Sequence, residues 1–198
     1  MAEQQPVSEA PVAPSAKQRL DPRVAFVLMV IMIICSLCIG ANKAWKKQRV
    51  NVDTAFSAWE ENLQMRVETC YNLLTVAGRY LPQSDALCAA VRADLKAMEN
   101  ASLALEDRAA AAARFEADAN ALLAALAADS AVMADSRDAM YVTSMLPQAV
   151  EQSAKDTAAK AYNTAAESYN GGLHSFSGLL ARLTGVGFAE VISLDTGA

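Results

Sequence analysis

Between Val24 and Ala41 the sequence runs for eighteen residues without a charged side chain, VAFVLMVIMIICSLCIGA. A helix of this length covers roughly 27 Å at about 1.5 Å per residue, against a hydrocarbon core of ~30 Å in a typical bilayer. Basic residues flank both ends of the run, and Trp45 fits the aromatic belt found at membrane surfaces. The run predicts a transmembrane helix over residues 23–42, with the lipid bilayer contacted through residues 24–41.

A cleaved signal peptide is the alternative interpretation of this run. The apolar stretch of a signal peptide is usually about 7 to 15 residues long, and Cys38-Ile39-Gly40 is a poor cleavage site. We therefore expect a single-pass protein of the inner (cytoplasmic) membrane. Three basic residues precede the run and four follow it, which leaves open the side of the membrane that the rest of the chain occupies. The small Ser36 and Gly40 are compatible with a homo-oligomer, although the run has no GxxxG motif.

The formal net charge of −5 is unevenly distributed along the chain. Residues 17–49 carry a net charge of +6, whereas residues 50–198 carry −9. A domain with this acidic balance cannot neutralise the phosphates of a duplex, so we expect no binding to nucleic acid. The basic block is explained by the membrane anchor, whose flanks it supplies.

Composition divides the chain into three parts. Residues 1–22 are rich in proline, alanine and serine, which predicts a disordered tail. After the membrane run, residues 43–198 form the predicted bundle domain. This domain has no glycine or proline from Gln83 to Leu146, so we expect an all-α fold and not a β-sandwich or a disulfide-rich scaffold.

Apolar or small residues recur every three or four positions in the first half of this domain, as on one face of a helix. They are Val52, Phe56, Trp59, Leu63, Val67, Cys70, Leu74, Ala77, Leu81, Ser84, Cys88, Val91, Leu95 and Met98. The rhythm crosses Pro82 in phase, and the residue four positions before the proline is the small Gly78. We therefore predict one helix over about 44–98, kinked at the proline. The alternative is a break at Leu81 and a new helix capped by Ser84.

The same rhythm predicts the elements that follow. They are an alanine-rich helix from about Arg108, a loop over 129–138, a short helix over 139–146 that ends near Pro147, and a last helix over 148–171 that Gly171-Gly172 terminates. Helices with short connections and heptad-like faces favour an up-and-down antiparallel bundle of three to four helices, preceded by the transmembrane helix.

A single histidine and four cysteines offer little for catalysis or metal binding. Cys35 and Cys38 lie inside the apolar run. Cys70 and Cys88 would be about 27 Å apart on one straight helix, so we predict free thiols. His174 has neither a second histidine nor an acid at a telling spacing. We expect no catalytic residue, no metal site and no cofactor.

Tyr162-Asn163 is followed seven residues later by Tyr169-Asn170. Seven residues are about two helical turns, so the two tyrosines share one edge of a helix and the two asparagines share the next. A tyrosine there can bury its ring while its hydroxyl reaches a partner, and an asparagine can bond to a neighbouring backbone. We interpret these residues as ties between helices, with a ligand site as the alternative. The other residues predicted to be structural are Trp59, Gly78 and Pro82.

Two groups of short motifs occur in order along the chain. The first holds Val52-Asp53-Thr54-Ala55-Phe56-Ser57, Gln64-Met65-Arg66, Asn72-Leu73-Leu74 and Gly78-Arg79-Tyr80. The second holds Tyr162-Asn163-Thr164-Ala165-Ala166-Glu167-Ser168-Tyr169-Asn170, Phe176-Ser177 and Gly187-Phe188. Together with the membrane run, these motifs resemble the LemA family. Phe56 stands where that family usually has tryptophan and Ser177 where it has proline, so the chain resembles a divergent member.

The resemblance implies a bacterial protein of the cell envelope, with a helical bundle after one membrane span and no established enzymatic activity. We therefore expect a non-enzymatic interaction or scaffolding module with an unknown protein partner. The alternative is a membrane-attached sensor that binds a small ligand between the helices and relays a shift through the anchor helix. An enzyme would need perturbed acid and base groups in a cleft, and the sequence points to none.

Overall fold

The computed structural model describes residues 21–154 and 157–192 of the chain. The predicted disordered tail covers residues 1–22, of which 1–20 lie outside the described residues. Every regular element in the described part is helical, which confirms the all-α prediction. The chain divides into two compact units, with the boundary between Leu37 and Cys38.

Helix α1 (Pro22–Tyr80) begins the described structure. Proline is tolerated at the first position of a helix because the first N–H groups have no partner within the helix. The carboxylate of Asp21 accepts the main-chain N–H of Arg23 at 2.9 Å. In the first unit the large apolar side chains from Val24 to Leu37 are exposed. Among the described residues, α1 is the one helix long and apolar enough to cross a membrane, judged by length and composition.

Pro82 separates two helices instead of kinking one. Helix α1 ends at Tyr80 and α2 (Ala86–Glu99) begins after a turn, so the single helix predicted over 44–98 is wrong. Proline cannot donate to the carbonyl four residues earlier, and it disfavours helical geometry in the residue before it. The cost of about 3 kcal/mol or more inside a helix is avoided by the turn.

A local cap makes the new helix start favourable. The carboxylate of Asp85, not the predicted Ser84, accepts the N–H groups of Leu87 at 2.9 Å and Cys88 at 3.2 Å. The apolar rhythm stays in phase across the break because both helices turn their stripes to the same core. The buried residues of α2 on this stripe are Cys88, Val91, Leu95 and Met98.

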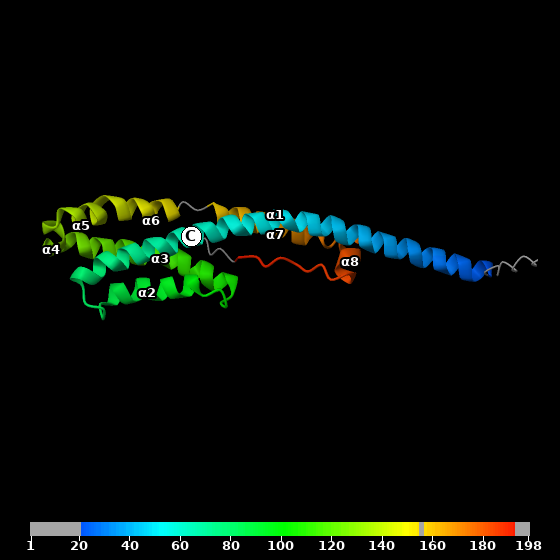
Figure 1. The fold of residues 1–198 in the computed structure, drawn as a ribbon, viewed down its shortest axis with the longest axis horizontal. Helices are drawn as coiled ribbons and strands as arrows, with labels where there is room; N and C mark the ends of the chain where they lie inside the picture. The colour runs from blue at the N-terminus through cyan, green and yellow to red at the C-terminus, as the bar shows by residue number, and fades with distance from the viewer. Residues whose placement is uncertain (1–20, 155–156, 193–198) are drawn as a thin grey trace, which may run out of the picture. The chain divides into compact units, whose positions relative to one another are not determined.

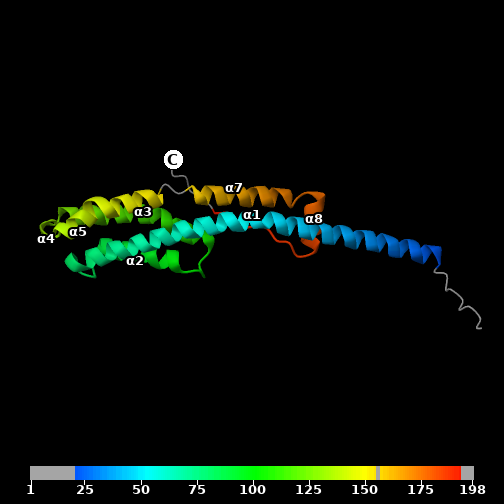
Figure 2. The ribbon, with the colours of Figure 1, turned by 45° about the horizontal axis from the view of Figure 1, so that its top comes forward.

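The second unit continues with α3 (Leu105–Ala128), α4 (Ser130–Ala134), α5 (Ser136–Met140), the π-helix η1 (Tyr141–Met145), α6 (Leu146–Ala154), α7 (Ala158–Gly172) and α8 (Phe176–Leu183). Helix α2 lies beside α3, and α3 also contacts α6 (Figures 1 and 2). The loop predicted over 129–138 is wrong, because Asp129 and Asp135 each cap a short helix there. The last helix predicted over 148–171 is described as α6 and α7, and α7 ends at the glycine pair as expected.

The chain also passes Pro147 without ending a helix. Pro147 is the second residue of α6, so the helix end predicted near it is wrong. The proline has no N–H for the carbonyl of Thr143. In the widened turn before it, the N–H of Leu146 donates to the carbonyl of Tyr141, five residues earlier. This π-turn absorbs the proline and lets α5, η1 and α6 follow one another directly.

The core of the second unit is built on one face each of α1 and α3. Its buried members include Trp59, Leu63, Leu73, Phe115, Leu122 and Leu126. Ala111, Ala112 and Ala119 are buried as well, and their small side chains let neighbouring helices approach closely.

Cys70 and Cys88 are buried free thiols, as predicted. They lie on two different helices, however, and not on one straight helix. Burial, with a smaller effect of nearby Asp94 and Glu99, raises the pKa of Cys70 to about 12. This thiol is therefore protonated and unreactive at neutral pH.

The guanidinium of Arg66 joins α1 to two other helices. Its Nη1 donates to the carbonyl of Ala112 in α3 at 2.8 Å. Its Nε and Nη2 donate to the carbonyl of Ser153 in α6 at 3.2 and 2.7 Å. Hydrogen bonds from a charged donor are stronger than neutral ones. Those of Arg66 therefore hold α3 and α6 in a fixed register against α1.

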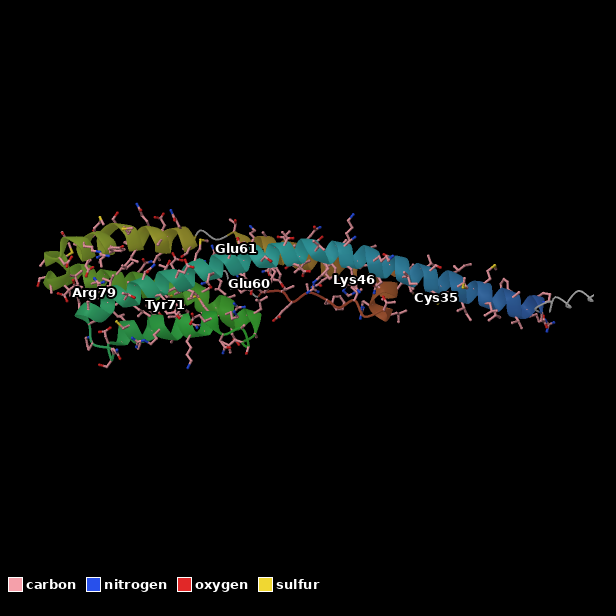
Figure 3. The ribbon with its side chains drawn as sticks, viewed as in Figure 1. Cys35, Lys46, Glu60, Glu61, Tyr71 and Arg79 are labelled. Atoms are coloured by element: carbon pink, nitrogen blue, oxygen red, sulfur yellow. The ribbon has the colours of Figure 1, made fainter. Side chains whose placement is uncertain are left out.

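An ion pair joins the end of α1 to α5. Nη1 of Arg79, labelled in Figure 3, lies 2.8 and 2.9 Å from the two carboxylate oxygens of Asp138, and the hydroxyl of Tyr80 donates to Oδ2 at 2.8 Å. The side chain of Asp138 is only 2% exposed. The hydrogen bonds from Tyr80 and Arg79 hold the pKa of Asp138 below its ordinary value, although burial acts in the opposite direction.

This pKa shift predicts that the contribution of Asp138 to stability depends on pH. A carboxyl whose pKa is lowered by folding stabilises the protein above its unfolded pKa of about 3.9, and this stabilisation is lost as the pH falls through the folded pKa. Asp138→Asn should therefore lower the melting temperature at pH 6 to 7, and the gap to the unchanged chain should narrow below about pH 4. Glu116→Gln, at an exposed position of α3, is the matched control. A gap that stays constant across this range would contradict the assignment.

Candidate functional site

The two Tyr-Asn pairs lie on α7, and their partner is an extended part of the chain. Both tyrosines are buried, and both asparagines are half-buried. Beside them runs the stretch 186–192, named here the terminal segment, which has no helical or strand structure. Its residues Val186, Ala189 and Ile192 are buried. In Figures 1 and 2 this red stretch follows α8.

Each asparagine makes a pair of hydrogen bonds with one residue of the terminal segment. Nδ2 of Asn163 donates to the carbonyl of Ile192 at 2.7 Å, and the N–H of Ile192 donates to Oδ1 at 2.9 Å. Nδ2 of Asn170 donates to the carbonyl of Ala189 at 2.8 Å, and the N–H of Ala189 donates to Oδ1 at 2.7 Å. Each side-chain amide thus supplies the donor and the acceptor that a neighbouring strand would otherwise provide to these main-chain groups.

The seven-residue repeat fits this partner by length. Seven residues of helix advance about 10.5 Å at ~1.5 Å per residue. Three residues of extended chain, from Ala189 to Ile192, advance about 10 Å at ~3.3 Å per residue. The distance along α7 between the two asparagines therefore matches the distance along the terminal segment between Ile192 and Ala189. The helix and the segment run in opposite directions.

The tyrosine hydroxyls add bonds to the same main chain. The hydroxyl of Tyr162 donates to the carbonyl of Glu190 at 2.6 Å, and that of Tyr169 to the carbonyl of Gly187 at 3.3 Å. Burial raises the pKa of Tyr162, so its hydroxyl keeps its proton at neutral pH. We name the four side chains and the terminal segment the Tyr-Asn ladder. They bond to main-chain atoms, so they recognise an extended backbone and not a particular side chain.

The tyrosine rings connect the ladder to α1. The ring of Tyr162 lies 5.6 Å from that of Phe56, between ring centres. The ring of Tyr169 meets that of Trp45 edge-on at 5.7 Å, and Cζ of Arg49 lies 5.7 Å from its centre. Such ring pairs add roughly 0.5–1.5 kcal/mol beyond the apolar area that they bury.

Trp45 belongs to the protein core and not to an exposed aromatic belt. Its side chain is buried, which corrects the role expected from its position after the membrane run. A Cβ placed on Gly172 would lie 2.4 Å from Cη2 of the indole, so the ring packs where glycine leaves room. Gly172 thus both ends α7 and seats Trp45. By contrast, Gly171 has nothing within 4 Å of such a Cβ.

The remaining predicted residues lie apart from the polar contacts of the ladder. Trp59 is a core residue whose ring packs on Phe56 at 5.7 Å and under Arg108 at 5.5 Å. Gly78 lies within α1 and Pro82 in the turn after it. The structure thus brings the two Tyr-Asn pairs together. Trp59 is connected to Tyr162 through the ring of Phe56, and Gly78 and Pro82 lie elsewhere.

The interpretation of the asparagines as ties between helices needs correction. They tie α7 to the terminal segment, which is not a helix. What sequence reasoning missed is this partner. One signal pointed to it, because Val186 and Ile192 are more apolar than a free chain end should be.

Several open grooves lie along α1. One of about 760 Å³ is lined in part by Gln48, Thr164 and Tyr169. Another, of about 390 Å³, is lined in part by Tyr162 and Glu190. A third, of about 590 Å³, is lined in part by Glu60 and Glu61, which are labelled in Figure 3. In the part of the chain that the structure describes, no group of three or more His, Cys, Asp or Glu side chains is placed to hold a metal ion.

The ladder predicts a strong and specific effect of Asn170→Ala. The change removes two hydrogen bonds and leaves the N–H and carbonyl of the buried Ala189 unpaired, at a cost of about 2–4 kcal/mol in the free energy of unfolding. Asn120→Ala, at an exposed position of α3, should not lower stability. Chemical denaturation of both variants measures the difference. Equal stability of the two would show that water replaces the ladder bonds at no cost.

No family model, no curated protein and no solved structure matches the chain. Its function is therefore argued from its own residues and contacts.

Proposed function

We propose that the protein is a single-pass, membrane-anchored bundle protein of the bacterial cell envelope that serves as a non-enzymatic interaction or scaffolding module. The observation that carries this proposal is the first part of α1, which is long and apolar enough to cross a membrane. The same helix continues into the second unit, where its side chains pack in the core. A helix shared in this way attaches the bundle directly to the bilayer.

The proposed arrangement of the second unit is an up-and-down antiparallel bundle of three to four helices. Its support is the short turn between α1 and α2, the packing of α2 on α3 and the contact of α3 with α6. The bonds of Arg66 to both α3 and α6 also support this arrangement. Short connections between long helices are typical of such bundles.

The contacts of the motif residues support a structural role. Arg66, Arg79, Tyr80 and the two Tyr-Asn pairs resemble LemA motifs, and each holds one element of this chain to another. Polar groups that already satisfy one another inside a fold favour a scaffold over a reaction centre. We accordingly propose a divergent LemA-like protein.

An interaction role is supported by exposed methionines on the part of the second unit that holds α4, α5 and η1. Met133, Met140 and Met145 are each about half-exposed. Methionine is flexible and polarizable, and it is common at surfaces that accept partner proteins. The sensor hypothesis needs an enclosed cavity among polar groups instead, and the side chain of Glu60 in the groove of about 590 Å³ is itself 48% exposed.

The membrane anchor predicts the behaviour of the full chain during alkaline carbonate extraction of cell membranes. The unchanged chain should stay in the membrane pellet, because eighteen uncharged residues span the hydrocarbon core. Ile31→Asp combined with Ile34→Asp should move it to the soluble fraction, since each buried charge costs about 2.5–3.5 kcal/mol at the bilayer centre. Val50→Asp, an exposed apolar position after the run, is the control and should stay in the pellet. Extraction of the unchanged chain would contradict the anchor.

The interaction role predicts crosslinking that depends on position. A photoreactive amino acid at Met140 in the full chain should give defined adducts with one or a few proteins in cells. The same group at Gln152, an exposed position of α6, should give few or none. Identical adducts from both positions, or none from either, would contradict a partner at the surface that bears Met133, Met140 and Met145.

A further inference from the structure

Helix α8 turns its small residues toward the bundle and three of its large residues away from it, while Leu180 packs partly against the core. Gly178 and Ala181 are buried, and a Cβ on Gly178 would lie 2.5 Å from the main chain of Leu173. Phe176, Leu179 and Leu183 are 75%, 48% and 80% exposed.

The three exposed residues form a single face of the helix. Their spacing of three and four positions places Phe176, Leu179 and Leu183 within one stripe, opposite Gly178 and Ala181. A surface helix that only covers a core would show the reverse arrangement, with its large apolar residues buried. A contiguous exposed apolar face of this kind marks a surface that meets another apolar phase.

The position of α8 points to the bilayer as this apolar phase. Thr184, the residue after the helix, accepts hydrogen bonds from Nδ2 of Asn42 at its Oγ1 (2.7 Å) and its carbonyl (3.2 Å). Asn42 is the first residue after the uncharged run 24–41. The end of α8 is therefore held at the level where α1 leaves that run. Within the second unit, Figures 1 and 2 both show α8 beside α1, at the opposite end from α4 and α5.

The charges at this level suit the headgroups of anionic lipids. Arg182 is exposed on α8 beside the apolar face. Lys43, Lys46 and Lys47 are exposed on α1 just after Asn42. Lysine and arginine next to an apolar stripe are typical of helices that lie in the membrane interface.

We propose that α8 is an interfacial helix whose residues Phe176, Leu179 and Leu183 insert into the same bilayer that residues 24–41 cross. This inference rests on the proposed membrane anchor. The bundle is then attached at two places, through α1 and through α8. Thr184 and Gly185 connect α8 to the terminal segment, so the Tyr-Asn ladder follows the inserted helix closely along the chain.

The test uses the full chain in vesicles of phosphatidylcholine and phosphatidylglycerol, with an environment-sensitive fluorophore on a single introduced cysteine. The exposed Cys35 and the partly exposed Cys38 are replaced by serine. Cys70 and Cys88 stay, because both are buried. The fluorophore is placed in turn by Leu183→Cys, by Met133→Cys as an exposed apolar control on α4, and by Ile34→Cys as a report on the anchor. A chain without an introduced cysteine measures background labelling.

Lipids that carry a quencher in the upper acyl chain should quench the fluorophore at position 183 about threefold more strongly than at position 133. Quenching at 34 together with equal, weak quenching at 183 and 133 would overturn the interfacial helix and leave the anchor intact. No quenching at 34 would overturn the anchor, and the inference with it. Disulfide-linked dimers of the unlabelled Leu183→Cys chain after addition of an oxidant, with no quenching of the labelled chain, would assign the face to a second copy of the chain and overturn the inference.

Discussion

An extended segment that packs against a helix has main-chain donors and acceptors that its neighbour's main chain cannot pair, because the neighbour's groups are used within the helix. A side-chain amide, which carries a donor and an acceptor in one plane, can pair both main-chain groups of such a residue. Asn163 and Asn170 do this for Ile192 and Ala189, two main-chain bonds each. The rest of this region depends on that pairing. Without it, burial of the terminal segment would leave polar groups unsatisfied, at about 1–3 kcal/mol each.

The terminal segment in turn determines what lies before it. Helix α8 makes few large apolar contacts with the rest of the second unit, since its buried residues are Gly178 and Ala181 and only Leu180 among its large residues packs partly against the core. It is held at one end by the hydrogen bonds of Asn42 to Thr184, and beyond that end by the ladder. A helix held mainly from its carboxyl end, with little packing of large side chains, is free to present its other large apolar residues outward. The ladder thus makes an exposed apolar face compatible with a stable fold.

Sequence patterns predicted the helical class and most of the buried stripe of α1 and α2, because a helical face needs only a regular period of apolar residues. The two prolines show where this reasoning stops. The apolar stripe crosses Pro82 in phase, yet the helix breaks there and Asp85 caps a new one. The spacing of apolar residues carries no information about such a local cap. Pro147 was expected to end a helix and does not, because η1 supplies a wider turn that leaves the proline without a required bond. The repeat of the Tyr-Asn pairs predicted a polar edge on one helix. The spacing does not indicate which part of the chain packs against that edge.

The two ends of the second unit are held by different physical interactions, and this difference has consequences for how the domain responds to its surroundings. At the α5 end, Arg79 and Tyr80 hold the ionised Asp138, so the contact weakens when that carboxylate is protonated. At the α8 end, the asparagine ladder consists of neutral amides bonded to main chain, which neither protonation nor moderate salt disrupts. Acid should therefore loosen the end that bears the exposed methionines before it loosens the end next to the membrane run. A domain built in this way can change its α5 end while its α8 end stays rigid.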